Sequence, residues 1–342
     1  MKIKPSFLAL LLCVGITNSS IGQTAEAFFN QGNEKLNRQD YKGAIDDFSK
    51  AIAQNPKLEN ACNGLALAKF QLHDLPGAIE AWSKALELNP TNAATYNYKG
   101  MAEHMQKDYP GALKDFNKAI ELNPQFTEAY SDRAYLRSTR EDYKGAIADY
   151  SKVIELDPQN TEAYNERGYA RYASGNPASA ITDYDKAIEL DSTYFKAYYF
   201  RGVIKYERKD YAGAVLDFDK AIALNPKFDA AYNNRGFAKN QLKDYEGAES
   251  DYDTSIQLNP NNPNAYNNRG LIKYALSDYR SAIADFTMAI KLSPNLAALY
   301  TNRAYAKLQI GDRNGGCDDL HKSKQLAPSD AGVDKLISQN CQ

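Results

Sequence analysis

The chain has 342 residues, of which 43% are apolar and 25% are charged, and this is the composition of an ordinary globular protein. Lys and Arg number 41 against 43 Asp and Glu, so the net charge of −2 gives no electrostatic reason to expect nucleic acid as a partner. The 25 tyrosines are unusual and require a structural explanation.

The first residues have the pattern of an export signal. Lys2 and Lys4 give a basic start, residues 7–16 form a short apolar run, and residues 17–23 are small and polar. We expect residues 1–22 to be the signal peptide, with cleavage after Gly22; retention of this segment as an anchor is the alternative. No second long apolar stretch follows. The sequence therefore predicts an exported protein, periplasmic or extracellular, with no stable membrane span after signal cleavage.

From residue 56 onward a proline recurs every 34 residues, with one omission at Ser192. The prolines of this column are Pro56, Pro90, Pro124, Pro158, Pro226, Pro260, Pro294 and Pro328. In this frame residues 23–328 divide into nine repeats, at about 25–56, 57–90, 91–124, 125–158, 159–192, 193–226, 227–260, 261–294 and 295–328. We refer to them as repeats 1 to 9.

Other columns of the same frame hold one kind of side chain each. In steps of 34, a column of Gly and Ala starts at Gly32, a column of Ala with one Gly at Ala44, a bulky column at Phe48, and a column dominated by Tyr at Phe28. Small residues let two helices approach closely, and bulky residues fill the space beside them. Most tyrosines are therefore expected to pack within the structure.

A column of Asp, with one Asn, starts at Asp40 and predicts the N-cap of a second helix in every repeat. Pro177, directly after Asn176, suits a first helical position. The Asn-Pro or Asp-Pro at most repeat ends predicts where each second helix stops, because the residue before proline avoids helical angles.

This pattern resembles the tetratricopeptide repeat (TPR) family, which has a 34-residue helix–turn–helix with two small columns, an aromatic in the second helix and a final proline. The resemblance covers nearly all of the chain after residue 22. It implies an all-α, right-handed solenoid of about nine units that forms one continuous domain, with first helices lining a concave groove.

An arginine column in the first helices is matched by an aspartate column in the second helices. The predicted pairs are Arg133–Asp149, Arg167–Asp183, Arg201–Asp217, Arg235–Asp251, Arg269–Asp285 and Arg303–Asp319. In repeat 2 both positions are apolar, Leu65 and Ala81. A guanidinium meets a carboxylate through two parallel hydrogen bonds, so we expect ion pairs between helices rather than a basic strip for an acidic ligand.

Two groups of side chains are candidates for a peptide-binding groove. The first comprises the asparagines Asn233, Asn234, Asn267, Asn268 and Asn302, in columns that the TPR resemblance places at the groove. Asparagine can donate to and accept from a peptide backbone, but helix–helix hydrogen bonds are the equal alternative. The second comprises Tyr135, Tyr169, Tyr172, Tyr199 and Tyr206, whose alternative is packing between repeats.

After Pro328, the helical spacing of Val333, Leu336 and Ile337 predicts a capping helix within residues 329–342. An antiparallel return of this helix would bring Cys341 to Cys317, so we predict a disulfide, with two free thiols as the alternative. Cys62, in the tyrosine column, is expected to be buried and free.

The chain has no catalytic signature, no CxxC, and only three scattered histidines, so we expect neither an enzyme nor a metal or other cofactor site. The sequence predicts an exported scaffold that binds a protein or peptide of unknown identity in its groove. A periplasmic chaperone-like or glycan-binding carrier is the alternative.

Overall fold

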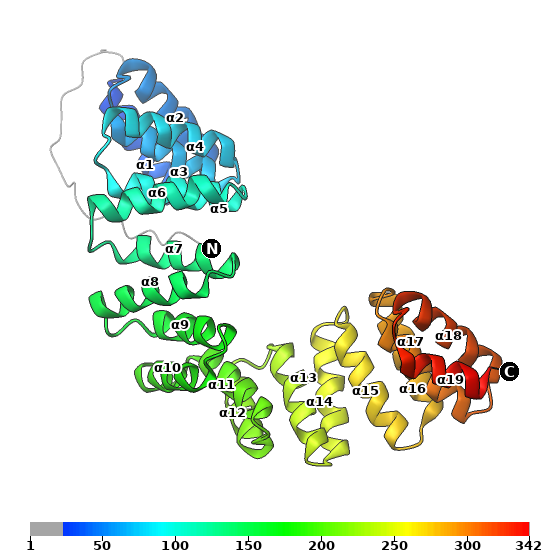
Figure 1. Cartoon of the computed structure of the whole chain (residues 1–342). Coiled ribbons are helices and arrows are strands. Elements are labelled where there is room, and N and C mark those ends of the chain that lie inside the picture. The colour runs from blue at the N-terminus through cyan, green and yellow to red at the C-terminus, as the bar shows by residue number, and fades with distance from the viewer. Residues whose placement is uncertain (1–22, 342) are drawn as a thin grey trace. The chain divides into compact units, whose positions relative to one another are not determined.

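The computed structural model describes residues 23–341, and its regular elements are helices arranged as nine pairs and a final single helix (Figure 1). The predicted all-α class is confirmed, and the described residues contain no strand. The export signal predicted at residues 1–22 lies outside them. The nineteen helices are α1 (Ala25–Asn37), α2 (Tyr41–Gln54), α3 (Glu59–Gln71), α4 (Leu75–Leu88), α5 (Ala93–Met105), α6 (Tyr109–Leu122), α7 (Thr127–Thr139), α8 (Tyr143–Leu156), α9 (Thr161–Ala173), α10 (Pro177–Leu190), α11 (Phe195–Glu207), α12 (Tyr211–Leu224), α13 (Asp229–Gln241), α14 (Tyr245–Leu258), α15 (Pro263–Ala275), α16 (Tyr279–Leu292), α17 (Ala297–Gln309), α18 (Arg313–Leu326) and α19 (Ala331–Asn340).

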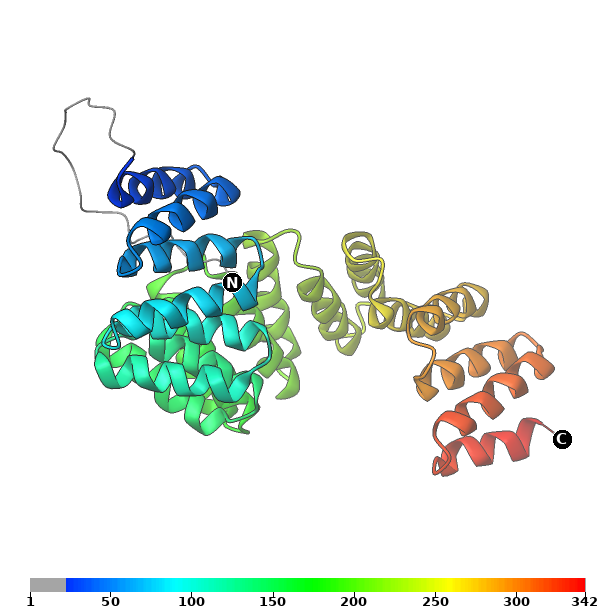
Figure 2. The ribbon, with the colours of Figure 1, turned by 90° about the horizontal axis from the view of Figure 1, so that it is seen from above.

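The chain divides into two compact parts, an N-terminal part, Met1–Leu136, and a C-terminal part, Arg137–Gln342. Odd-numbered helices α1 to α17 are the first helices of the repeats, and even-numbered helices are the second. A first helix within one part packs on the second helix of its own repeat and on that of the preceding repeat, as α13 does on α14 and α12. Figure 2 shows this succession along the C-terminal part from α13 to α19. Each repeat therefore buries its apolar face against its immediate neighbours.

The predicted N-caps are confirmed in all nine second helices, because the side chain of the Asp or Asn accepts a hydrogen bond from the backbone three residues later. Asp244 Oδ1, for example, accepts from the amide of Gly247 at 3.0 Å. Pro177 opens α10 as predicted. Such a cap satisfies one of the free amides of the first turn, and its removal typically costs about 1 kcal/mol.

The small and bulky columns meet in the core of each repeat. A Cβ on Gly168 would lie 2.9 Å from the ring of Tyr184, and one on Gly236 would lie 2.8 Å from the ring of Tyr252. Both rings are essentially fully buried. The aromatic ring of the second helix therefore fits because the glycine that faces it on the first helix has no side chain.

The predicted ion pairs between first and second helices are confirmed at five arginines, each of which bonds both carboxylate oxygens of its aspartate through Nε and Nη2 at 2.5–3.1 Å. These pairs are Arg167–Asp183, Arg201–Asp217, Arg235–Asp251, Arg269–Asp285 and Arg303–Asp319. The aspartates are buried. Hydrogen bonding to Asp217 raises the pKa of Arg201. In repeat 2, Leu65 packs instead in an apolar cluster with Ala81.

The predicted capping helix is α19, which covers the last repeat. Asp330 caps its start, and Val333 is buried against Ala304 and Leu320. Sγ of Cys317 and Sγ of Cys341 are 2.05 Å apart in a disulfide, the pairing that the sequence favours. Cys62 is buried and unbridged, as predicted, and burial raises the pKa of its thiol.

Candidate functional site

The first helices of the C-terminal part carry a row of apolar side chains at one repeat position, which we call the apolar row. Its members are Tyr169 (α9), Val203 (α11), Phe237 (α13), Leu271 (α15) and Tyr305 (α17). Leu271 and Tyr305 are 40% and 39% exposed, and the other three are half-buried. Exposed apolar side chains that recur on successive helices form a surface able to bind a partner.

Only the first member of this row, Tyr169, was among the residues that the sequence predicts for the groove. Tyr135, the equivalent residue in the N-terminal part, is 46% exposed. Val203, Phe237, Leu271 and Tyr305 were not predicted, because the sequence candidates were tyrosines of the middle repeats. The 34-residue spacing itself would have found them.

A chain of hydrogen-bonded amides, which we call the amide ladder, lies beside the row. Asn302 Nδ2 donates to Asn267 Oδ1 at 2.9 Å, and Asn267 Nδ2 donates to Asn268 Oδ1 at 3.4 Å. Asn268 Nδ2 donates to Asn233 Oδ1 at 3.1 Å, and Asn233 Nδ2 donates to Asn234 Oδ1 at 3.3 Å. All five candidate asparagines therefore belong to one network that links α17, α15 and α13.

The network separates the asparagines into two groups. Asn233 and Asn268 are 8% and 5% exposed, and each uses its oxygen and its nitrogen within the ladder. Their arrangement corresponds to the helix–helix alternative. Asn234, Asn267 and Asn302 are only half-buried, and each carboxamide has a second N–H besides the one used in the ladder. These three are the amides that remain accessible to a ligand.

The ladder ends at α11, where aromatic side chains replace the asparagines. Tyr199 Oη accepts from Asn234 Nδ2 at 3.0 Å, and its ring lies 4.7 Å from that of Phe228 and 5.2 Å from that of Phe200. Phe200 and Asn165 occupy the repeat positions of Asn268 and Asn233. Because Phe200 has no amide to donate, Asn165 Oδ1 is buried without a hydrogen-bond partner. Tyr199 is thus a packing residue between repeats.

The other candidate tyrosines are partly occupied by neighbours. Tyr172 donates to Glu207, and burial together with this hydrogen bond raises the pKa of Tyr172 to about 12. The ring of Tyr206 lies 5.4 Å from that of Tyr211 and 6.2 Å from that of Phe237. Tyr172 and Tyr206 remain half-buried, and Tyr206 adjoins the apolar row through Phe237.

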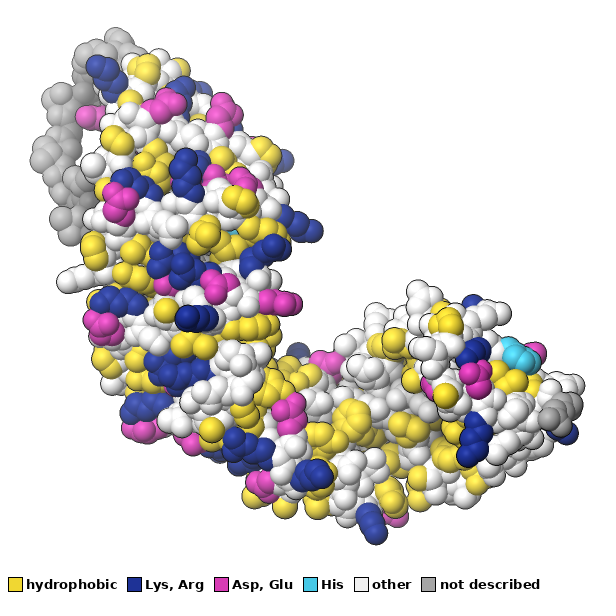
Figure 3. Space-filling view, viewed as in Figure 1, with side chains coloured by type: hydrophobic (Ala, Val, Ile, Leu, Met, Phe, Trp, Pro, Cys, Tyr) yellow, Lys and Arg dark blue, Asp and Glu magenta, His cyan; other side chains and the backbone are white. Residues whose placement is uncertain are grey.

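Surface charge, possible metal ligands and helix hydropathy are three further features of the described residues. On the face shown in Figure 3, side chains of both charges are interspersed over the two parts. Among residues 23–341, no group of three His, Cys, Asp or Glu is placed to hold a metal ion. No helix within that range has both the length and the hydropathy needed to cross a membrane.

Family models match more than half of the chain. A model described as TPR repeat matches residues 139–175, 168–207 and 202–243, and models described as tetratricopeptide repeat match residues 59–92, 93–126, 230–262 and 263–296. No curated protein matches the chain.

Several solved structures share the fold at low sequence identity. The C-terminal part of a TPR repeat-containing protein from Cytophaga hutchinsonii is 17% identical with a TM-score of 0.59, covering 70% of this chain and 98% of that one. The pilF protein of Pseudomonas aeruginosa is 20% identical with a TM-score of 0.57, covering 62% and 97%. The Cut9–Hcn1 hetero-tetramer of the APC/C gives 16% identity and a TM-score of 0.59, covering 93% and 76%.

Proposed function

Because the chain belongs to the tetratricopeptide repeat proteins, which are protein-interaction scaffolds, we propose that it is an exported, non-catalytic scaffold that binds a polypeptide segment along the first helices of its C-terminal part. The observation that carries this proposal is the apolar row, in which exposed or half-buried apolar side chains recur at the same position of successive helices. The bound segment would lay apolar side chains against Phe237, Leu271 and Tyr305.

The composition of this surface suits a polypeptide ligand. Aromatic side chains give large contact areas at low cost in conformational entropy, and they are enriched where proteins bind one another. The spare N–H groups of Asn234, Asn267 and Asn302 lie on the same helices as the apolar row. They would donate to backbone carbonyls of the segment without reading its sequence.

Export is supported by two independent features of the chain. Residues 1–22 have the basic, apolar and small-polar succession of a signal peptide. The disulfide between Cys317 and Cys341 suits an oxidising compartment, because thiols in the cytosol are normally kept reduced. The mature scaffold would therefore act in the periplasm or outside the cell.

The alternative is a carrier for many unfolded chains or for cell-wall glycan. Sugar binding would use open aromatic faces for stacking, whereas the rings of Tyr199 and Tyr206 pack on neighbouring aromatic rings. The packing of these two rings supports the proposal of a polypeptide ligand over a glycan. One tight consensus sequence would indicate a scaffold, and many weak, unrelated sequences would indicate a chaperone-like carrier.

Selection of peptides from a displayed library tests the proposed function. We expect selected peptides to bind the wild-type protein and to lose at least about tenfold in affinity to Leu271→Asp, because a buried unpaired charge replaces an apolar contact. Leu216→Asp is the matched control, since Leu216 is 69% exposed on the second helix α12. Equal loss in both variants, or loss only in the control, would place the binding surface elsewhere.

A further inference from the structure

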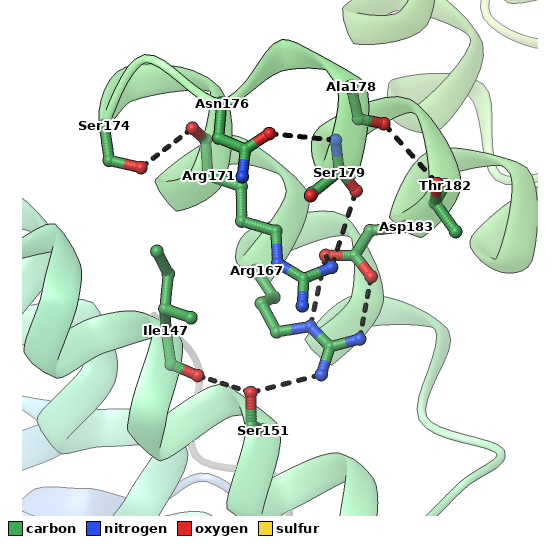
Figure 4. A network of polar contacts seen from close by, with 10 residues as sticks. All are labelled: Ile147, Ser151, Arg167, Arg171, Ser174, Asn176, Ala178, Ser179, Thr182 and Asp183. Atoms are coloured by element: carbon green, nitrogen blue, oxygen red, sulfur yellow. Dashed lines mark hydrogen bonds and ion pairs between the residues drawn. The ribbon is translucent and has the colours of Figure 1, made fainter.

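The arginine column fills a definite place between the second helices of consecutive repeats. In repeat 5, Arg167 bonds Asp183 through Nε and Nη2 at 3.1 and 2.7 Å, and its Nη1 donates to Ser151 Oγ on the preceding second helix at 3.1 Å (Figure 4). The guanidinium also lies 5.5 Å from the centre of the Tyr164 ring. A carboxylate, a hydroxyl oxygen and an aromatic face therefore surround one planar cation.

Repeat 3 keeps these surroundings but lacks the guanidinium. Asp115, Ser83 and Tyr96 occupy the positions of Asp183, Ser151 and Tyr164, each 68 residues earlier in the chain. Ser83 Oγ donates to the carbonyl of Ile79 at 2.7 Å, as Ser151 Oγ does to the carbonyl of Ile147 at 2.6 Å. The lone pairs of the two hydroxyl oxygens therefore have the same orientation relative to their helices. The position of Arg167 is taken by Lys99.

Lys99 does not substitute for the arginine. Its Nζ turns to Asp115 Oδ2 at 2.5 Å and to Glu103 Oε1 at 2.7 Å. Within the described part of the chain, nothing donates to Asp115 Oδ1, and no cation lies over the ring of Tyr96. A lysine has neither the length nor the planar fork to reach both second helices.

A cavity of about 640 Å³ opens at this place, in the N-terminal part between α4 and α6. Its lining includes Ser83, Tyr96, Lys99 and Asp115, and Leu86 forms part of its wall. This volume is within the range of small-ligand sites in proteins. The cavity thus coincides with the groups that hold a guanidinium in repeat 5.

The carboxylates at the cavity outnumber its bases by one: Glu87, Asp115 and Glu121 line it together with Lys99, Lys114 and Lys118, and Glu103 lies against Lys99. Lys99 contacts two buried carboxylates, those of Glu103 and Asp115, and among the described residues no other base forms an ion pair with either of them. Burial raises the pKa of Glu103, and Glu103 Oε2 has no hydrogen-bond partner. Lysine at the rim does not prevent guanidinium binding, because Lys118 pairs with Glu121 just as Lys186 pairs with Glu189 beside Arg167.

We propose that the cavity between α4 and α6 binds the guanidinium group of an arginine that the chain itself does not supply. The guanidinium would donate to Asp115 Oδ1 and Ser83 Oγ and would stack on Tyr96. Free arginine and an arginine side chain of a partner polypeptide present the same group. The proposal is independent of the apolar row, which lies in the other part of the protein.

Titration of the full mature protein with four probes tests the proposal: free L-arginine, N-acetyl-L-arginine amide and the two corresponding lysine compounds. NMR shifts of the Leu86 methyl groups report binding at the cavity wall. We expect at least one arginine probe to bind, and its lysine counterpart to bind at least about tenfold more weakly, because an ammonium cannot make the bidentate contact. Binding of free arginine alone would identify an amino-acid ligand, whereas binding of the amide would identify an arginine of a polypeptide.

Two variants control for the site. The double variant Lys99→Arg, Glu103→Arg recreates the arrangement of Arg167 and Arg171 in repeat 5, so it should fill the cavity with the chain's own guanidinium and lower probe affinity at least about tenfold. Ser83→Ala, which keeps a good helix former at this position, should lower affinity about fivefold through one lost hydrogen bond. Absence of any Leu86 shift, equal binding of lysine probes, or unchanged affinity in a folded double variant or in Ser83→Ala would overturn the proposal.

Discussion

Replacement of Asp132 by asparagine should stabilise the N-terminal part of the protein at neutral and alkaline pH. Asp132 on α7 occupies the repeat position of Asn268, and Asn97 on α5 that of Asn233. Asn97 Nδ2 donates to Asp132 Oδ2 at 2.8 Å, but Asn97 Oδ1 is buried without a partner. In Asp132→Asn the new amide would donate to Asn97 Oδ1, as Asn268 donates to Asn233.

The expected gain in the free energy of unfolding follows from the negative charge that the substitution removes. Burial, opposed by the hydrogen bond from Asn97, raises the pKa of Asp132 from 3.8 to about 6. Because the folded-state pKa is raised, the native state is relatively favoured below about pH 4, and this advantage is lost as the pH rises through about 6. A shift of about two units corresponds to at most about 3 kcal/mol, and since the residue is only half-buried we expect about 1–2 kcal/mol at pH 8.

Urea unfolding of wild type and Asp132→Asn at pH 4 and pH 8, together with hydrogen exchange in α5 and α7, measures this effect. Hydrogen exchange is needed because repeat arrays do not always unfold in one step. The gain should be present at pH 8 and small at pH 4. Glu80→Gln, at an exposed position of α4, is the control and should change stability little at either pH. A variant less stable than wild type at pH 8, or a gain independent of pH, would refute the reasoning.

Three further predictions concern the contacts between helices. Arg235→Ala and Asp251→Ala should each lower the free energy of unfolding by about 2–4 kcal/mol, and the double variant by about 1–3 kcal/mol less than their sum; additive effects in a double-mutant cycle would contradict the pairing. Replacing Cys317 and Cys341 by serine should destabilise the C-terminal cap by about 2–3 kcal/mol, seen as faster hydrogen exchange in α19, and unchanged exchange would count against a structural bridge. Asn268→Leu should lower the free energy of unfolding by about 2–3 kcal/mol through the loss of one buried and one partly buried hydrogen bond, measured by thermal and urea unfolding, and a neutral result would show that the ladder contributes little.

The fold could be predicted from the sequence because every repeat forms the same helix pair through the same local contacts. A cap such as Asp244 and a small residue such as Gly236 act within a few residues or against a fixed neighbour, so their columns predict helix boundaries and packing. The Arg235–Asp251 pair was predictable for the same reason, since Arg and Asp recur at these two positions of the frame from repeat 4 onward.

The site was less accessible because its features depend on differences between repeats. The columns show that Asn233 and Asn268 are neighbours, but they do not show that these amides bond one another rather than a ligand. Likewise, Lys99 reads as an ordinary substitution for arginine until its contacts with Glu103 and Asp115 show that the place of the guanidinium is open. Both cases depend on the direction in which the side chains point in the folded protein, and the periodicity of the sequence does not contain this direction.

Site-specific photo-crosslinking in the native cell envelope tests the central claim most directly. A photoreactive amino acid placed at Leu271 or Tyr305 samples the apolar row, and one at Leu216 on α12 samples a second helix. The account predicts that the first two positions yield the same crosslinked polypeptide and that Leu216 yields none. Crosslinking of that polypeptide at Leu216 alone would contradict the proposal that the first helices of the C-terminal part bind the partner.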